Sequence, residues 1–317
     1  MALWVDSTLA RVTSILGPRD SALRTACRRL AMRAACARHG ARLSFTNDCI
    51  DVSKGNRVIR IAMQHFPFAL DMSRSFDLYF EQMVPTGTGQ LSVDYSRPRL
   101  HRYAGSGLEF ELSSFAEEAA AIESYFRWYR PKPGDIVFDV GAYCGVSSYH
   151  FAQMVGPSGK VYAFEPDPLN FSLLQRNIAR HGLTNVFPLQ VAISATSGSA
   201  DFFCEGTLGS TLAAHSSRIY GGGITRVQTI TFEQACLTYG VPAFAKIDIE
   251  GAEVAVLAAA ADFLKTHGIN FTLDTNHIVA GKLSNRAVET QLAACAYEVE
   301  SSDEFGFMTT WARPPRP

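Results

Sequence analysis

The sequence predicts an α/β protein whose C-terminal two thirds form a doubly wound, mostly parallel sheet. After Gly134, apolar strand-like segments alternate with helical ones, and each of these strands is apolar throughout. Such strands are typical of a parallel sheet that is buried on both faces. Near the C-terminus, two further strand-like segments flank residues 303–306 and predict an antiparallel hairpin.

The elements of this part follow in chain order. Strands are predicted at 136–140, 160–166, 186–193, 243–249 and 270–275. Helices are predicted at 146–155, 168–181 and 252–268. The second helix has the clearest ends, because Asp167 suits an N-cap, Pro168 suits the first helical position, and Gly182 suits a C-cap. The closing hairpin pairs residues 297–302 with 307–313.

The first forty residues predict a basic amphipathic helical segment. They carry seven arginines against two acidic residues, and Leu23, Cys27, Leu30 and Ala34 recur at helical spacing. A targeting peptide or a membrane-surface helix has similar features. We favour a helix that packs on its own domain or on a partner subunit, and an exposed apolar stripe would suit a homodimer.

Residues 41–112 predict a small β-rich N-terminal section. The segment 49–61 (CIDVSKGNRVIRI) predicts a hairpin around Lys54-Gly55-Asn56, and further strands are expected within 92–103 and 107–114. The aromatic residues of this section are expected in its core: Phe66, Phe68, Phe76, Tyr79 and Phe80. A helix at 115–129 then follows in the main domain, which is predicted to span 113–317.

Composition limits the class of protein. An apolar fraction of 47% and a charged fraction of 19% are typical of a soluble globular chain. The net charge of −1 argues against a general nucleic-acid binder. Seven cysteines without a CxxC pair indicate reduced thiols in a cytoplasmic protein. No apolar run reaches the roughly 18–20 residues of a membrane span.

The turn after the first strand, in residues 136–147 (IVFDVGAYCGVS), carries the main functional signal. A dinucleotide-binding turn requires G-x-G-x-x-G, because its middle glycine lets the backbone approach a pyrophosphate. Tyr143 occupies that position, which disfavours a nicotinamide-dependent oxidoreductase. S-adenosylmethionine has no phosphate, and its cationic groups suit the carboxylates of Asp139 and Glu165. Glu165 ends the second strand, where an acid can accept both ribose hydroxyls. The alternative is that Asp139 caps a helix and Glu165 is a solvated acid.

Several segments resemble the FkbM-type S-adenosylmethionine-dependent methyltransferases. They are VFDVGAYCG, AFEPDPLNFSLLQRN, VAIS followed by Gly198, GST at 209–211, and the most specific one, KIDIEGAE at 246–253. The family commonly has Gly-Ala-Asn where this chain has Gly141-Ala142-Tyr143. The resemblance implies a class I methyltransferase fold, S-adenosylmethionine as cofactor, and O-methylation of a sugar or secondary-metabolite hydroxyl. The implied cofactor contacts are Asp139, Gly141, Ala142, Tyr143, Gly145, Glu165, Pro166, Asn170 and Ala192.

Candidate catalytic residues follow the fourth and fifth strands, at the edge where ligands bind in such sheets. Asp248, Glu250 and His277 are candidates for a general base, and Asp274 is placed to face or orient His277. His277 could instead be structural, and the two acids could orient their turn or bind the acceptor. A further alternative is a divalent ion such as Mg²⁺ or Mn²⁺ held by Asp248, Asp274 and His277.

The Gly/Ser-rich stretch 205–226 predicts a mobile cover over the site, with Ser210 and Thr211 as substrate contacts, or else an ordinary long loop. The sequence therefore favours an O-methyltransferase acting on a small molecule such as a sugar or polyketide. An N-methyltransferase on a small amine stays open. So does a cofactor-binding scaffold whose N-terminal section recruits a partner.

Overall fold

A computed structural model of the chain describes residues 22–117, 119–204, 207, 209–212 and 223–315. Predictions for residues 1–21 and for much of the stretch 205–222 lie outside the described residues. The chain forms two compact units: one holds residues 110–113 and those from 117 onward, and the other holds the residues up to 109 with 114–116. Within the described residues, no helix combines the length and apolar character needed to cross a membrane.

The N-terminal unit contains a four-stranded sheet in the order β1-β2-β3-β4. Its strands are β1 (Arg42–Phe45), β2 (Cys49–Lys54), β3 (Arg57–Ala62) and β4 (Leu91–Tyr95). Strands β2 and β3 pair antiparallel with Lys54 opposite Arg57, so Gly55 and Asn56 form a two-residue loop. This confirms the predicted hairpin.

The aromatic segment of this unit is helical, which differs from the expected run of short β pieces. It forms η1 (Met63–Phe68), α3 (Ala69–Arg74) and α4 (Phe76–Glu81). Four of its five named aromatics are buried as predicted, whereas Phe66 is half-buried. The segment lacks the alternation of apolar and polar residues that a half-buried strand requires. Strands β5 (Arg99–Arg102) and β6 (Glu109–Leu112) follow.

Helix α2 (Ala22–Ala37) buries a different face from the one that carries the predicted apolar stripe. Leu30 is 67% exposed, whereas Met32, Ala35 and Cys36 are buried. These three residues also recur at helical spacing, and Met32 adds a larger apolar side chain than Ala34 could. The guanidinium groups of Arg29 and Arg33 lie 5.1 and 5.0 Å from the ring centroid of Phe45.

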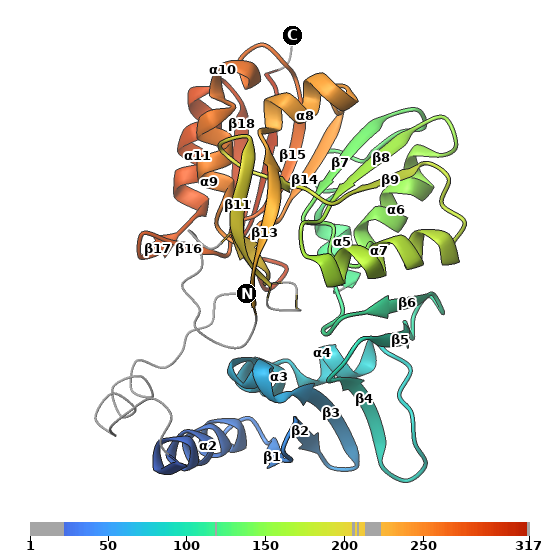
Figure 1. Cartoon of the computed structure of the whole chain (residues 1–317), viewed down its shortest axis with the longest axis vertical. Coiled ribbons are helices and arrows are strands. Elements are labelled where there is room, and N and C mark those ends of the chain that lie inside the picture. The colour runs from blue at the N-terminus through green and yellow to red at the C-terminus, as the bar shows by residue number, and fades with distance from the viewer. Residues whose placement is uncertain (1–21, 118, 205–206, 208, 213–222, 316–317) are drawn as a thin grey trace. The chain divides into compact units, whose positions relative to one another are not determined.

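The C-terminal unit is built on a seven-stranded sheet in the order β18-β19-β15-β14-β7-β8-β9 (Figure 1). The first five of its strands along the chain are parallel, and β19 and β18 pair antiparallel at one edge. The strands are β7 (Ile136–Val140), β8 (Lys160–Phe164), β9 (Val186–Leu189), β14 (Phe244–Ile247), β15 (Asn270–Asp274), β18 (Glu298–Ser302) and β19 (Thr309–Arg313). The predicted doubly wound, mostly parallel sheet with a terminal hairpin is confirmed.

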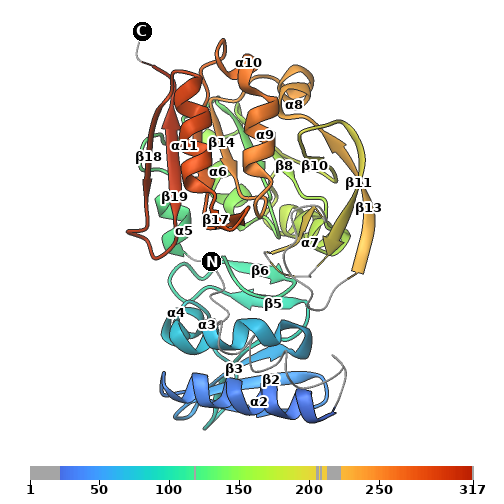
Figure 2. The same cartoon turned by 90° about the vertical axis from the view of Figure 1, so that its left-hand side faces the viewer.

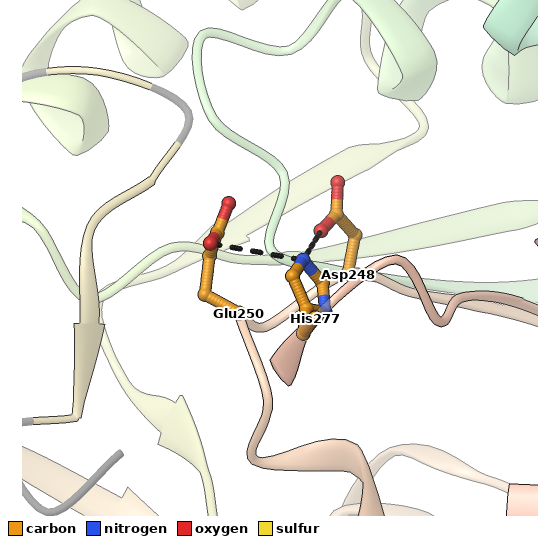
Figure 3. A group of neighbouring side chains, drawn as sticks. All are labelled: Asp248, Glu250 and His277. Carbon is orange, nitrogen blue, oxygen red and sulfur yellow. Dashed lines mark ion pairs between the residues drawn. The ribbon is translucent and has the colours of Figure 1, made fainter. Parts of the chain in front are cut away.

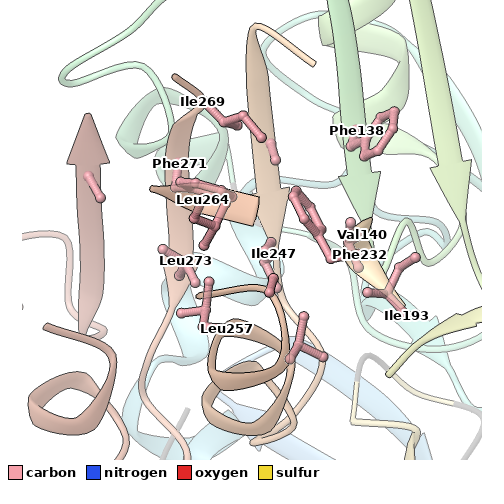
Figure 4. Close-up of a cluster of buried hydrophobic side chains, with 14 of the residues drawn as sticks. Phe138, Val140, Ile193, Phe232, Ile247, Leu257, Leu264, Ile269, Phe271 and Leu273 are labelled. Atoms are coloured by element: carbon pink, nitrogen blue, oxygen red, sulfur yellow. The ribbon is translucent and has the colours of Figure 1, made fainter. Parts of the chain in front are cut away.

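Helices cover both faces of this sheet (Figure 1 and Figure 2). One face carries α5 (Ala119–Ser124), α6 (Val146–Val155) and α7 (Pro168–Arg180). The other carries α8 (Phe232–Tyr239), α9 (Glu253–Ala259), α10 (Ala261–Leu264) and α11 (Asn285–Ala294). Under the second group of helices, Phe138, Phe232, Ile247, Leu257 and Phe271 belong to one buried cluster (Figure 4). This packed core fixes the strand ends that carry the candidate site.

Three predicted elements differ from the structure. The predicted third strand ends at Leu189, because the N–H of Val191 donates to the Leu189 carbonyl at 2.9 Å and turns the chain. The helix predicted at 252–268 is divided at Ala260, whose backbone leaves helical geometry at φ −92° and ψ 0°. The helix predicted at 115–129 is confined to the six residues of α5.

The stretch predicted as a cover is partly a second sheet, in the order β10-β13-β11-β12. Its strands are β10 (Ala192–Ile193), β11 (Gly198–Cys204), β12 (Thr211–Leu212) and β13 (Gly223–Ile230). The prediction of a long loop is therefore wrong for residues 211–212 and 223–226. The β-branched residues Thr225, Val227 and Thr229 alternate with Arg226 and Gln228 along β13, which is the missed strand signal.

Candidate active site

A pocket opens at the carboxyl ends of the parallel strands β7, β8 and β14. It encloses about 550 Å³ of space, part of which is open solvent. The predicted site residues that line it are Gly141, Tyr143, Glu165, Pro166, Asn170, Ala192, Ser210 and Asp248. Apolar side chains such as Ile193, Phe202 and Leu212 complete the wall. A largely apolar pocket with a few polar groups at this edge is typical of ligand sites in α/β sheets.

The glycine turn after β7 is held close to the end of β14. Gly141 has φ +79°, and a Cβ added to it would lie 1.9 Å from the backbone oxygen of Asp248. The N–H groups of Gly141 and Ala142 both donate to the Phe164 carbonyl at 3.0 Å. Gly145 precedes α6 at φ +88°, and a Cβ there would meet Leu174 at 2.5 Å. Gly141 is required by conformation and by space, because the nearby atom belongs to the backbone, whereas Gly145 is required by its conformation.

Tyr143 adopts the left-handed backbone region at φ +50°, which is uncommon for a residue other than glycine or asparagine. Its N–H donates to Glu165 Oε2 at 2.8 Å. Its hydroxyl lies 3.0 Å from the Ser113 hydroxyl, which donates to Asn170 Oδ1 at 2.7 Å. The side chain that departs from the Gly-Ala-Asn pattern is thus bonded into the pocket wall, together with Asn170 of α7.

Glu165 is a buried pocket residue and not the solvated acid of the alternative interpretation, since it is 5% exposed. Its Oε1 accepts the N–H of Asp167 at 2.9 Å, and its other oxygen accepts that of Tyr143. Burial, followed by the neighbouring Asp167 carboxylate, raises the pKa of Glu165 to about 8. Each carboxylate oxygen can accept a further hydrogen bond from a ligand.

Asp139 lies behind the glycine turn and does not line the pocket. Its Oδ2 accepts the hydroxyls of Ser147 and Ser148 at 2.8 and 2.6 Å, in the first turn of α6. Its Oδ1 lies 3.6 Å from the ammonium of Lys246. Asp139 therefore contacts the first turn of α6 through serine side chains, but it does not cap the helix, because the N-cap residue is Gly145 and the groups that Asp139 bonds there are hydroxyls, not backbone N–H groups. A cofactor contact by Asp139 stays a prediction.

Lys246 is the cation at the centre of this region, and the sequence interpretation missed it. It is 3% exposed, donates to the Gly141 carbonyl at 2.7 Å, and lies 3.8 Å from Asp248 Oδ2. Burial alone would lower the pKa of Lys246, but the carboxylates of Asp139 and Asp248 raise it above its ordinary value. A lysine inside the otherwise apolar strand AFAKI was the available signal.

Asp248, Glu250 and His277 meet beside the pocket (Figure 3). His277 Nε2 lies 3.8 Å from Asp248 Oδ1 and 3.7 Å from Glu250 Oε2. Glu250 follows β14 in the left-handed region at φ +57°, a conformation that is often strained in residues at functional sites. The sequence placed these three residues at one sheet edge, and the structure brings them together.

The acid that contacts the other ring nitrogen of His277 is Glu253 and not Asp274. Glu253 Oε1 lies 2.9 Å from His277 Nδ1 and also accepts the N–H groups of Ile249 and Gly251. Asp274 accepts the N–H of Asn276 at 2.9 Å. Asp274 is also absent from the group of described residues whose ligand atoms converge. Glu253 therefore stands in the orienting position predicted for Asp274, and Glu250 stands in its predicted place among the possible metal ligands.

The charges of this cluster shift its proton affinities. Burial would lower the pKa of His277, but the carboxylates of Glu253 and Glu250 raise it to about 10. Burial raises the pKa of Asp248 to about 7, although Lys246 opposes that rise.

Of the two predicted substrate contacts, Ser210 donates to Asp167 Oδ2 at 2.9 Å and Thr211 donates to the Glu250 carbonyl at 3.4 Å.

The strand order, the glycine turn and the acid that ends the second strand together define a class I methyltransferase fold. Residues 139–310 match the model of the methyltransferase FkbM domain. The chain therefore belongs to the FkbM family of S-adenosylmethionine-dependent methyltransferases, as the sequence resemblance implied.

Individual relatives are distant or match only in part. A segment of 50 residues is 48% identical to the 31-O-demethyl-FK506 methyltransferase FkbM of Streptomyces tacrolimicus, and it spans 16% of this chain and 19% of that relative. Methyltransferase FkbM from Methylobacillus flagellatus is similar with a TM-score of 0.43 and 12% identity, over 90% of this chain and 59% of that one. Aeropyrum pernix fibrillarin, solved with S-adenosyl-L-methionine, is similar with a TM-score of 0.38 and 15% identity. That similarity covers 85% of this chain and 97% of the fibrillarin chain.

Proposed function

We propose that this FkbM-family methyltransferase transfers a methyl group to a hydroxyl of a small acceptor, such as a secondary metabolite or a sugar. The observation that carries the proposal is Asp248, whose carboxylate lines the pocket beside Glu250 and His277. A hydroxyl acceptor benefits from a positioned base, which typically contributes about 10²–10⁴-fold. The name of the Streptomyces tacrolimicus relative, an O-methyltransferase, supports the same acceptor atom.

The pocket suits S-adenosylmethionine. Glu165 offers two carboxylate oxygens for ribose hydroxyls. Among the described lining residues there is neither Lys nor Arg, so a pyrophosphate would face carboxylates without a counter-charge. When bound, S-adenosylmethionine supplies a methyl group that its sulfonium activates. These features favour it over a nicotinamide dinucleotide.

The protein contributes position and a proton acceptor. Orienting two reactants can lower a barrier by roughly 7–11 kcal/mol. We assign this orientation to the glycine turn, to Glu165 and to the wall formed by Tyr143 and Asn170. Asp248 accepts the proton of the acceptor hydroxyl, and Ser210, which lines the pocket, is a candidate contact for the acceptor.

The test compares oxygen and nitrogen acceptors directly. Labelled S-adenosylmethionine is supplied with panels of sugars, polyketides and small amines, using the wild type and Asp248→Asn. The proposal predicts turnover of a hydroxyl acceptor and a fall in kcat of about 10²-fold or more in the variant. S-adenosylhomocysteine affinity should change little, because Asp248 is assigned to the acceptor. Turnover of amines alone would favour the N-methyltransferase, and cofactor binding without any turnover would favour the scaffold.

We also propose a cytoplasmic location for this enzyme. All seven cysteines lie among the described residues, and each is a free thiol. Reduced thiols suit a compartment kept reducing. Alkylation of the thiols in freshly lysed cells, before and after reduction, checks this: the same number of modified cysteines is expected in both samples.

A further inference from the structure

Three side chains beside the pocket present their ligand atoms to one point. One atom each from Asp248, Glu250 and His277 lies within 4.8 Å of the other two. The imidazole Nε2 faces both carboxylates at 3.7–3.8 Å, as Figure 3 shows. These separations exceed the roughly 2.7–3.2 Å of a hydrogen bond, so the three groups surround a common centre without bonding one another directly.

His277 has an unsatisfied nitrogen that points into this centre. The residue is 7% exposed, and neither of its ring nitrogens makes a hydrogen bond of good geometry among the residues that the structure describes. Nδ1 lies 2.9 Å from Glu253 Oε1, whereas the carboxylates that face Nε2 are 3.7–3.8 Å away. A buried ring nitrogen without a partner is costly, because it loses its bond to water and gains none in the protein. A ligand at the centre of the cluster would satisfy it.

The opposite side of the ring is arranged as in metal-binding histidines. Ligating histidines almost always present their second nitrogen to a carboxylate or carbonyl, which fixes the ring and its tautomer. Here Glu253 Oε1 lies 2.9 Å from His277 Nδ1, and the backbone N–H groups of Ile249 and Gly251 hold that oxygen. Glu253 is fully buried, so its position is fixed by the fold.

The charge balance also favours a cation. Lys246 lies beside the other oxygen of Asp248, at 3.8 Å from Oδ2, and therefore leaves Oδ1 facing the imidazole. Among the described residues, the carboxylates of Asp248, Glu250 and Glu253 surround the imidazole, and a bound cation would take the place of the proton that they otherwise hold on His277. Two carboxylates and one imidazole form a mixed oxygen and nitrogen set, which suits Mn²⁺ or a similar first-row ion better than Mg²⁺.

We propose that Asp248, Glu250 and His277 bind one divalent cation of the Mn²⁺ type, with Glu253 as the positioning residue behind the histidine. Three protein ligands leave coordination positions open, and Asp248 faces the pocket, so an acceptor oxygen could complete the set. Binding of the ion by itself requires neither S-adenosylmethionine nor an acceptor. Its test therefore stands apart from the test of methyl transfer.

The experiment titrates MnCl₂ into the full chain after treatment with a chelator, and follows free Mn²⁺ by electron paramagnetic resonance. We expect one site per chain. Glu250→Gln and Asp248→Asn should each weaken it at least tenfold, and Glu253→Gln should weaken it about 10–100-fold. The matched control is Asp274→Asn, which removes a neighbouring charge outside the ligand set and should change the affinity less than threefold.

Circular dichroism of each variant establishes that it is folded. Glu250→Gln is the principal variant, because its side chain is partly exposed and the substitution preserves its size. The proposal is overturned if the folded wild type binds no Mn²⁺ at about millimolar concentration. It is equally overturned if Asp274→Asn weakens binding as much as Glu250→Gln does, since that result would indicate only a diffuse acidic surface.

Discussion

The backbone oxygen of Asp248 lies 1.9 Å from the place that a Cβ on Gly141 would occupy. A hydrogen bond also joins the end of β7, just before the glycine turn, to the end of β14: the N–H of Asp248 donates to the Val140 carbonyl at 3.0 Å. Position 141 therefore requires glycine for two reasons: there is no room for a Cβ, and the backbone is in the left-handed region at φ +79°. Two backbone contacts therefore hold the glycine turn beside the candidate base.

Replacing Gly141 by alanine should reduce stability strongly. The new Cβ would overlap a backbone atom that cannot rotate away, so we expect a loss of about 3 kcal/mol or more in the free energy of unfolding. Gly182→Ala is the matched control, because it is also left-handed at φ +60° but has no atom within 4 Å of the added Cβ. That variant should lose about 1–2 kcal/mol. Urea unfolding of both variants measures the difference, and equal losses would refute the close approach.

Lys246→Met should destabilise the fold around two buried acids. Removing one partner of a buried charge pair typically costs about 3–5 kcal/mol, because the remaining charge is left uncompensated. Here both Asp139 and Asp248 would lose their ammonium neighbour, and the Gly141 carbonyl would lose a hydrogen bond. Lys265→Met, in an exposed pair with Asp262, should leave the unfolding midpoint close to that of the wild type, because solvent screens exposed pairs. Similar unfolding midpoints for the two variants would contradict this assignment.

Asn177→Ala should weaken the connection between α7 and the glycine turn. The Asn177 amide donates to the carbonyls of Glu111 and Cys144 and accepts the N–H of Glu111, all at 2.8 Å. Losing three hydrogen bonds, of which one is buried and two are partly buried, should cost about 3 kcal/mol in chemical unfolding. Gln175→Ala, on the exposed side of the same helix, should stay within about 0.5 kcal/mol of the wild type. A neutral Asn177→Ala would show that these bonds add no net stability.

The sequence predicted the parallel sheet because each of its strands carries a local signal of apolar residues and flanking turns. It also placed Glu165, Asp248 and His277 at one edge, since the carboxyl ends of parallel strands lie together. It could not assign Glu253 to His277, because that contact depends on how the turn after β14 folds back. Lys246 was missed for a related reason: a buried lysine is identified by its partners, and Asp139 is more than 100 residues away in sequence.

The second sheet was not predicted from the sequence for a different reason. Strand β10 follows a local turn at Leu189, and the single strand predicted over 186–193 overlooked Pro188 and Gln190, which interrupt its apolar residues at that turn. Likewise, helix α2 offers two apolar stripes, and only packing determined that Met32 and Cys36 face inward while Leu30 is exposed. In such cases tertiary contacts choose between local alternatives of similar strength.

Cofactor binding should strengthen as pH rises. Burial raises the pKa of Glu165 to about 8, so the free protein holds a proton there at lower pH. Ribose hydroxyls bond best to the carboxylate, and binding below pH 8 must therefore release that proton. We expect the Kd of S-adenosylhomocysteine to fall by up to about tenfold per pH unit between pH 6.5 and 8, and to level off above it. Titrations at pH 6.5, 7.5 and 8.5 measure this, and a pH-independent wild type would contradict it.

We assign the pocket beside Glu165 to S-adenosylmethionine. Calorimetric titration with S-adenosylhomocysteine at pH 8.5 tests it most directly, with NAD as the competing ligand and Glu165→Gln as the variant. We predict binding of S-adenosylhomocysteine at one site, no binding of NAD, and at least tenfold weaker binding in Glu165→Gln, because the amide has lost one acceptor oxygen and the charge. Binding of NAD, or an unchanged affinity in the folded variant, would contradict the account.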